Sequence, residues 1–93
     1  MRIIWSNKSL ADIENIFNYI KLDNKKKAGE FILEIREKIN LLKDFPEIGK
    51  CSALFNENNN IREFVLHKNY LVSYKVKKEE IQVLQVWQAR KGM

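Results

Sequence analysis

The segment YLVSYKV, residues 70–76, decides the fold, because its side chains alternate in character from one residue to the next. One face of an extended chain would carry Tyr70, Val72, Tyr74 and Val76. The other face would carry Leu71, Ser73 and Lys75. A period of two is typical of a β-strand that turns one face to a core. The segment therefore predicts the middle strand of a sheet.

One strand is predicted on each side of this segment. Residues 61–67 form the preceding strand, and Lys68-Asn69 makes the tight turn between the two. Residues 77–80 form the next turn, and residues 81–88 form the last strand. Short turns join antiparallel neighbours, so these strands predict a mainly antiparallel sheet.

A further strand and a first helix are predicted at the start of the chain. Residues 2–5, RIIW, are β-branched and aromatic and predict a strand. The helix begins after Ser6 or Ser9, since either hydroxyl can serve as an N-cap, and it ends near Leu22. Its apolar stripe comprises Leu10, Ile13, Phe17 and Ile20. This spacing predicts an amphipathic helix with one face on the core.

A second helix follows directly. It begins near Asn24 or Lys25, and Pro46 stops it. Its stripe comprises Ala28, Phe31, Ile32, Ile35, Ile39 and Leu42. From Cys51 to Asn60 the sequence has no period and predicts a polar surface loop.

The predicted element order is β-α-α-β-β-β. A helix hairpin packed on one face of a sheet of about four strands is a two-layer α+β fold. The chain has 93 residues. Two cores within that length would each be too small to be stable, so residues 1–93 are expected to form a single domain.

Composition excludes several classes of protein. One cysteine and one histidine cannot build a disulfide framework or a structural zinc site, so no metal or cofactor is expected. The sequence lacks dinucleotide-binding, Walker and zinc-protease motifs. It also lacks an apolar run long enough to span a membrane, and its N-terminus is too short and polar for a secretory signal. A cytoplasmic protein with no membrane association is therefore expected.

Positive charge gathers in the last third of the chain. Residues 61–93 carry 7 Lys/Arg and 3 Asp/Glu, a net +4 of the whole chain's +5. An uneven distribution of this kind indicates an anionic partner such as RNA, DNA or an acidic protein. Lys77 and Lys78 have a simpler interpretation, because a charged pair in a turn is usually a solvated surface.

The candidate functional residues are mainly cations. Arg62, Lys75 and Arg90 could hold phosphates, although Arg62 could equally pair with Glu63 or a helix carboxylate. Trp87 would anchor a partner if exposed and would belong to the core if buried. The single histidine, His67, is expected to be an exposed bystander. A nucleophilic pair of Cys51 with His67 has no third group to orient it.

Four segments resemble the RelE/ParE toxin superfamily. They are WSNKSLADIENIFNYI (residues 5–20), LLKDFPEIGK (41–50), IREFV with YLVSYKV (61–65 and 70–76), and VLQVWQAR (83–90). Each is a weak match alone, but together they cover nearly the whole chain in order. The resemblance implies the toxin of a type II toxin–antitoxin pair, neutralised by a cognate antitoxin. It also implies that operator DNA is bound only through the antitoxin.

Members of this superfamily act on different targets. RelE-like members cleave mRNA on the ribosome, and ParE-like members poison DNA gyrase; a shared fold does not distinguish them. The resemblance gives Arg62, Arg90 and Lys75 a catalytic role only in a RelE-like protein. The last-strand histidine frequent in that branch is Gln88 here, and glutamine cannot transfer protons near neutral pH.

We therefore expect a ParE-like toxin that contacts its target or antitoxin through Trp87, Gln88, Arg90 and Lys91. Two alternatives stay open. One is a RelE-like ribosome-dependent endoribonuclease that inhibits translation. The other is an inactive relative that serves antitoxin binding and operon autoregulation.

Overall fold

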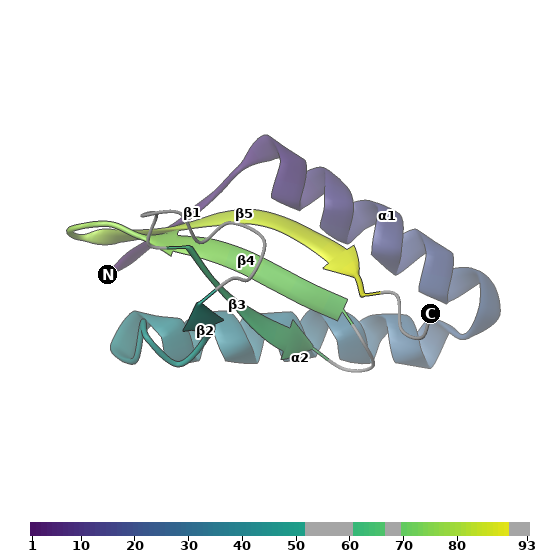
Figure 1. Cartoon of the computed structure of the whole chain (residues 1–93). Coiled ribbons are helices and arrows are strands. Elements are labelled where there is room, and N and C mark those ends of the chain that lie inside the picture. Colours follow the sequence, from purple (N-terminus) through teal and green to yellow (C-terminus); the bar gives the residue numbers. More distant parts are fainter. Residues whose placement is uncertain (52–60, 67–69, 90–93) are drawn as a thin grey trace.

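The computed structural model describes residues 1–51, 61–66 and 70–89. Its elements are β1 (Arg2–Trp5), α1 (Asn7–Asp23), α2 (Lys25–Asp44), β2 (Lys50–Cys51), β3 (Ile61–Leu66), β4 (Tyr70–Val76) and β5 (Glu80–Gln88) (Figure 1). The strands form one sheet in the order β1-β5-β4-β3-β2. β1 is parallel to β5, and the other neighbouring pairs are antiparallel. The predicted α+β fold is confirmed.

The sheet has five strands, where the sequence predicted about four. The additional strand, β2, is two residues long, with Lys50 opposite Glu63 and Cys51 opposite Arg62. Two residues cannot display a period, so no sequence pattern could have predicted this strand. The predicted turn at Lys68-Asn69 and the remainder of the predicted loop, residues 52–60, lie outside the described residues.

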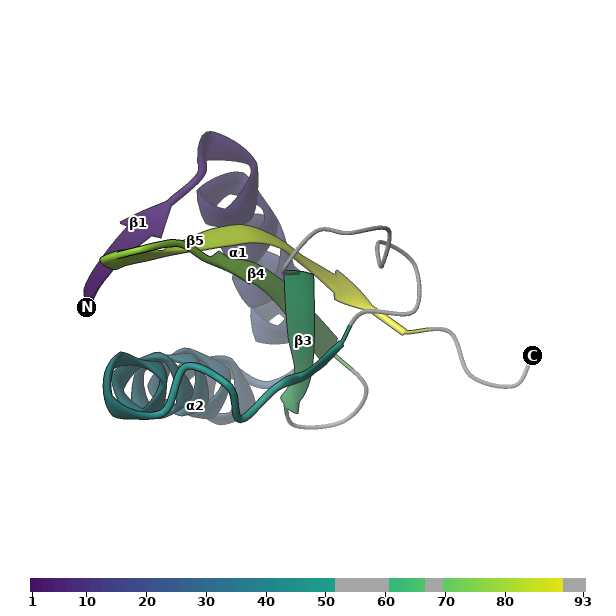
Figure 2. The same ribbon diagram turned by 60° about the vertical axis from the view of Figure 1, so that its left-hand side comes forward.

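The two helices form a hairpin, with α2 lying beneath the sheet and α1 running beside β5 (Figures 1 and 2). Asn24 ends α1 and also caps α2, its side-chain oxygen accepting from the Lys27 N–H at 3.0 Å. The boundary predicted between Leu22 and Lys25 therefore contains a capping residue, which explains how two long helices follow each other without a loop.

The core lies between α2 and the sheet. α2 buries Ala28, Phe31, Ile35, Ile39 and Leu42, which are members of its predicted stripe. The strands bury Phe64, Leu66, Tyr70, Val72, Tyr74, Ile81, Val83 and Val86. A tilted aromatic pair, Phe31–Tyr70, joins α2 to the sheet with its ring centroids 5.3 Å apart. A second tilted pair, Phe64–Tyr74, joins β3 to β4 with its centroids 5.9 Å apart. Offset pairs of this kind add to the stabilisation from burial.

The stripe of α1 is less completely buried than that of α2. Ile13, Ile16 and Ile20 pack against the core, but Leu10 remains 51% exposed. α1 covers the side of the sheet and not its centre. Part of the apolar face of α1 therefore packs against the core, and part remains exposed at the surface between the two helices.

β5 contains a bulge where it leaves the neighbourhood of β1. Ser73 pairs with Gln85 and Tyr74 pairs with Val83, so Leu84 is an extra residue in β5. β1 pairs only with Glu80–Val83. The edge of β5 beyond this point has no neighbouring strand on that side, and bulges commonly mark such places.

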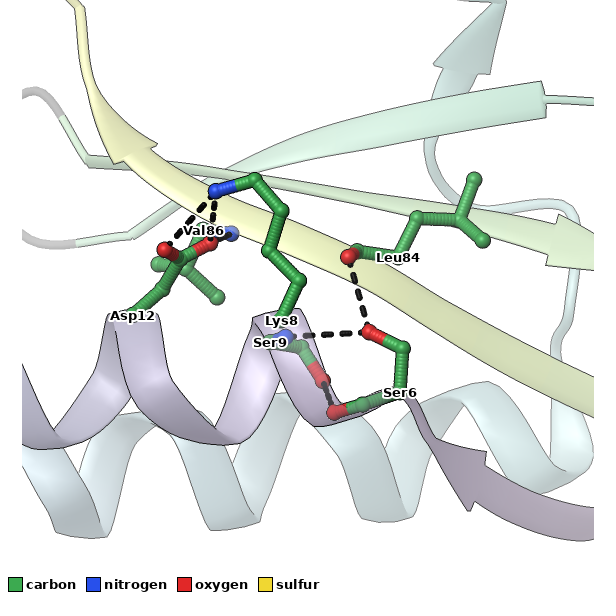
Figure 3. Close-up of polar contacts among 6 residues, drawn as sticks. All are labelled: Ser6, Lys8, Ser9, Asp12, Leu84 and Val86. Atoms are coloured by element: carbon green, nitrogen blue, oxygen red, sulfur yellow. Dashed lines mark hydrogen bonds and ion pairs between the residues drawn. The ribbon is translucent and has the colours of Figure 1, made fainter.

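The N-terminal part of α1 covers this unpaired edge (Figure 3). The Ser6 hydroxyl donates to the Leu84 carbonyl at 2.9 Å, and the Val86 N–H donates to the Asp12 carboxylate at 2.9 Å. Ser6 also caps α1, accepting from the Ser9 N–H at 2.9 Å. Side chains of the helix thus replace a missing strand, which prevents exposure of unpaired backbone groups. They also hold the end of β5 that carries Trp87 and Gln88.

Candidate functional site

Arg62 lies in β3 opposite Tyr74 of β4, and its side chain binds the turn after α2. Its guanidinium donates to the Gly49 carbonyl at 2.7 Å and to the Glu47 carbonyl at 3.4 Å. Neither partner predicted for Arg62, the carboxylate of Glu63 or one on a helix, bonds to it in the described part of the chain. Arg62 instead holds backbone oxygens that a turn leaves unpaired.

Tyr74 binds the same turn from the middle of the sheet. Its hydroxyl donates to the Pro46 carbonyl at 2.8 Å and accepts from the Gly49 N–H at 2.9 Å. The side chain is fully buried. Burial raises the pKa of the Tyr74 hydroxyl above its ordinary value of 10.0, although the hydrogen bond from Gly49 and the nearby charge of Arg62 oppose this rise. Tyr74 therefore keeps the proton that it donates.

Only glycine fits at position 49, next to the hydroxyl of Tyr74. A Cβ there would lie 2.6 Å from the Tyr74 hydroxyl oxygen and 2.8 Å from the Glu63 carbonyl oxygen. Both distances are well below van der Waals contact. The segment PEIG, residues 46–49, is thus clamped by one arginine and one tyrosine from neighbouring strands.

Lys75 lies on the opposite face of the sheet from Arg62. It pairs with Ile61 of β3 and Gln82 of β5, whereas Arg62 pairs with Tyr74. Directly opposite residues share a face, and successive residues alternate. The structure therefore does not bring Arg62 and Lys75 together. Arg90, the third predicted phosphate ligand, and His67 lie outside the described residues.

Glu63 is a carboxylate that the sequence analysis did not select as functional. It lies on the same face as Lys75, opposite Ser73 of β4. One carboxylate oxygen of Glu63 and the hydroxyl of Ser73 are buried and have no hydrogen-bond partner among the described residues. The only feature of the sequence that could have indicated this group is the strand period of two, which is consistent with residues 63, 73 and 75 on one face.

Trp87 belongs to an apolar row on this same face. Val65, Leu71 and Trp87 lie opposite one another on β3, β4 and β5, and we call them the apolar row. Val65 is 56% exposed, and Leu71 and Trp87 are partly exposed. Trp87 is therefore not part of the core between α2 and the sheet. The adjacent Gln88 is exposed, while Arg90 and Lys91 lie outside the described residues.

A second apolar surface lies between the helices. Leu10, Ile13, Glu14 and Phe17 of α1 line a groove with Gly29 and Ile32 of α2. A Cβ at Gly29 would meet no atom within 4 Å, so the groove is open above it. Apolar grooves between helices are suited to receive an amphipathic helix of another protein.

Two kinds of site are not seen in the part of the chain that the structure describes. Within it, no group of three or more His, Cys, Asp or Glu residues is placed to hold a metal ion. No helix there has the length and apolar character needed to cross a membrane.

Comparison with known proteins places the chain in a family. Residues 3–93 match the family described as the ParE toxin of the type II toxin–antitoxin system parDE. A solved structure described as a chromosomal ParDE toxin–antitoxin system from P. aeruginosa has a TM-score of 0.78 and 22% identity, covering 97% of each chain. No curated protein matches the sequence. The structural likeness shows the fold, and the family match covers nearly all of the sequence. The chain therefore belongs to the ParE family of type II toxin–antitoxin toxins.

Proposed function

We propose that this toxin inhibits bacterial growth by binding DNA gyrase in the cytoplasm, through protein–protein contact and without cleaving RNA. The observation that carries this proposal is the hydrogen bonding of the Arg62 side chain. A nuclease needs cations that converge on a scissile phosphate. Here the guanidinium of Arg62 is bound to the carbonyls of Glu47 and Gly49, and Lys75 lies on the opposite face.

The contact surface that we propose is the C-terminal end of β5 with the residues that follow it. Trp87 is partly exposed in the apolar row, and Gln88 next to it is exposed. Arg90 and Lys91, which follow Gln88 and Ala89 in the sequence, would add positive charge. An aromatic anchor beside arginine is the composition typical of residues that dominate binding energy at protein interfaces.

Membership of the ParE family implies a cognate antitoxin as partner. We propose that the antitoxin places an amphipathic helix in the groove between α1 and α2, and that operator DNA is bound only through the antitoxin. The apolar lining from Leu10, Ile13, Phe17 and Ile32 supports this arrangement. An acidic antitoxin would also complement the positive charge of residues 61–93.

The target is tested by pulse labelling after tightly controlled induction in a bacterium. Methionine and thymidine incorporation are followed side by side, and the purified protein is added to a gyrase supercoiling assay. We expect thymidine incorporation to fall first and supercoiling to be inhibited. Trp87→Ala should weaken both effects. Lys77→Ala is the matched control, because Lys77 precedes β5 and Trp87 lies near its other end, roughly 25 Å away at the strand rise of 3.3 Å per residue.

A second candidate function rests on Glu63 and Lys75. A carboxylate and an amine on one face could serve a RelE-like endoribonuclease as proton-transferring and phosphate-binding groups. In that case methionine incorporation would fall first, and Glu63→Gln would abolish the effect. Glu79→Gln, an exposed change in the β4–β5 turn, is the control. This outcome would contradict the gyrase proposal.

A further inference from the structure

A cleft lies between the terminal strand β1 and α2, which occupy the same side of the molecule (Figure 2). Its volume is about 570 Å³, and cavities of roughly 300–1,000 Å³ are the usual size of small-molecule sites. Ile3 and Trp5 of β1 and Ile39 of α2 are among its apolar lining residues. These residues belong neither to the β5 surface proposed for gyrase nor to the groove proposed for the antitoxin helix. The chemistry of the cleft therefore has to be explained separately.

Three cations line the cleft, and none of its described lining residues is acidic. Arg36 and Lys43 of α2 are exposed, and neither forms an ion pair with another residue in the described part of the chain. Arg2 of β1 pairs with Glu80 at 3.3 Å, but the Arg2 side chain is 75% exposed. An exposed pair of this kind contributes little, so an anion in the cleft can compete for Arg2. The cleft therefore favours a ligand with several negative charges.

An amide lies between two of these cations. Arg36, Asn40 and Lys43 share one face of α2, at positions i, i+4 and i+7. Seven residues of helix rise about 10.5 Å, so the two cations are attached about that far apart, with Asn40 between them. The Asn40 side chain is exposed and forms no hydrogen bond with another described residue. A carboxamide offers one donor and one acceptor, the pair that matches the N6 and N7 edge of adenine.

Trp5 adds an aromatic ring to the same cleft. It is partly buried and packs against the core, and it also lines the cleft. Nucleobases stack on aromatic side chains of this kind. The lining thus combines the groups that a nucleotide requires, which are cations for its phosphates, an amide for the edge of its base and a ring for the face of its base.

Neighbouring charges favour a single nucleotide over a nucleic acid strand. Glu37 and Asp44 directly follow Arg36 and Lys43 in the sequence, and both carboxylates are exposed on α2. A phosphate backbone that continued out of the cleft across α2 would approach these carboxylates, and like charges repel. A single nucleotide keeps its phosphates beside the cations. Inorganic polyphosphate would also do so, but it would leave the ring and the amide without a partner.

We propose that the cleft binds a nucleoside triphosphate, and that adenosine is the nucleoside that its lining fits best. The phosphates contact Arg2, Arg36 and Lys43. The adenine ring lies against Trp5, and its edge meets the amide of Asn40. The ligand links β1 to α2, and no covalent bond is made or broken. The inference does not depend on the identity of the toxin's target.

Tryptophan fluorescence tests the site directly, because Trp5 and Trp87 are the two tryptophans of the chain. Free toxin is prepared by co-expression with the antitoxin encoded beside it, separation in denaturant and refolding. In Trp87→Phe, the fluorescence of the remaining Trp5 should be quenched saturably by ATP. In Trp5→Phe, the fluorescence of Trp87 should show no saturable change. Calorimetry with the unsubstituted toxin then measures the affinities for ATP, adenosine and tripolyphosphate.

These affinities should reflect both halves of the ligand. Adenosine lacks the charges and tripolyphosphate lacks the base, so each should bind about tenfold or more weakly than ATP. Asn40→Leu should weaken the binding of ATP and leave that of tripolyphosphate unchanged, because the amide meets only the base.

Charge reversal provides an independent readout. Arg36→Glu with Lys43→Glu should weaken ATP binding about tenfold or more. The matched control, Lys77→Glu with Lys78→Glu, makes the same change of charge in the exposed β4–β5 turn and should have a smaller effect. Mapping of NMR chemical shifts on the unsubstituted toxin avoids any folding defect of a variant. ATP should shift the amide signals of residues 2–5 and 36–43 and leave those of residues 77–79 unchanged.

Four results would overturn the inference. The first is the absence of saturable binding of ATP at millimolar concentration. The second is equal affinity for tripolyphosphate and ATP, which would reduce the cleft to a patch of positive charge. The third is tighter binding of a single-stranded oligonucleotide than of ATP, which would assign the cleft to a nucleic acid. The fourth is a set of shifted signals centred outside the cleft. Each of these results leaves the gyrase assay and its interpretation unaffected.

Discussion

The carboxylate of Asp12 in α1 accepts a hydrogen bond from the backbone N–H of Val86 in β5, at 2.9 Å (Figure 3). The two residues are 74 positions apart in the chain. With the hydroxyl of Ser6 on the Leu84 carbonyl, this bond closes the part of the β5 edge that β1 does not reach. A helix side chain therefore supports the strand end that we propose as the target-binding surface.

Loss of the Asp12 carboxylate should destabilise the fold. Asp12→Ala would leave the Val86 N–H without a partner at a partly buried position, at a cost of about 1–3 kcal/mol. Asp12→Asn keeps an acceptor oxygen and should cost less. Lys8→Ala removes only the exposed partner of Asp12 and should change stability by less than about 1 kcal/mol. Denaturant unfolding measures all three, and equal midpoints for Asp12→Ala and Lys8→Ala would refute the assignment.

The clamp on the PEIG turn predicts coupling between Tyr74 and Arg62. Tyr74→Phe would leave the Gly49 N–H and the Pro46 carbonyl unpaired, at a cost of about 1–3 kcal/mol. Arg62→Ala should also destabilise, and Arg62→Lys, which keeps a donor, should destabilise less. Because both side chains hold one turn, the double variant should depart from additivity by about 0.5 kcal/mol or more.

Because Arg62 holds the PEIG turn, a structural role of this residue can be distinguished from a catalytic one. If Arg62 is structural, the toxicity of Arg62→Ala follows the folded fraction of the protein and returns at lower temperature. Growth arrest and circular dichroism are compared across temperatures. Complete loss of toxicity in a fully folded Arg62→Ala protein would favour direct contact with the target, alone or together with Arg90.

The two glycines among the described residues, Gly49 in the PEIG turn and Gly29 inside α2, should respond in opposite ways to substitution by alanine. Gly49→Ala would place a Cβ 2.6 Å from the Tyr74 hydroxyl oxygen, so the turn must shift and stability should fall. Gly29→Ala lies inside α2 with no atom within 4 Å of the new Cβ. It should raise stability by about 0.5–1 kcal/mol, because alanine restricts the unfolded chain and favours helix. Thermal unfolding distinguishes the two, and a stabilising Gly49→Ala would contradict the clamp.

Burial of Tyr74 predicts a loss of stability in alkali. Its pKa is raised by burial in the folded state, from the ordinary value of 10.0. The unfolded chain therefore releases this proton at lower pH than the folded chain does. The stabilisation is fully present below about pH 10 and is lost as the pH rises through the folded pKa. Unfolding followed by tyrosinate absorbance should show this decline, and it should be smaller in Tyr74→Phe.

The sequence alone determined the elements that depend on local periodicity. The stripe of α2 from Ala28 to Leu42 became the helix side of the core, and Tyr70, Val72 and Tyr74 became its sheet side. These patterns are readable because a helix or strand repeats its direction every 3.6 or 2 residues. The membership of the toxin family was likewise carried by motifs along the chain, and the family match over residues 3–93 confirms it.

Only the tertiary structure decided what the polar side chains do. Several features depend on contacts between residues distant in the chain. They are the pairing of β2 with β3, the bulge at Leu84 in the pairing of β5 with β4, and the hydrogen bonds of Asp12, Arg62 and Tyr74. The sequence offered Arg62 as a phosphate ligand or ion-pair partner, yet its contacts are the backbone oxygens of a turn that folds against it. A hydrogen bond depends on which backbone groups the assembled fold leaves unpaired, and no local period in the sequence records that.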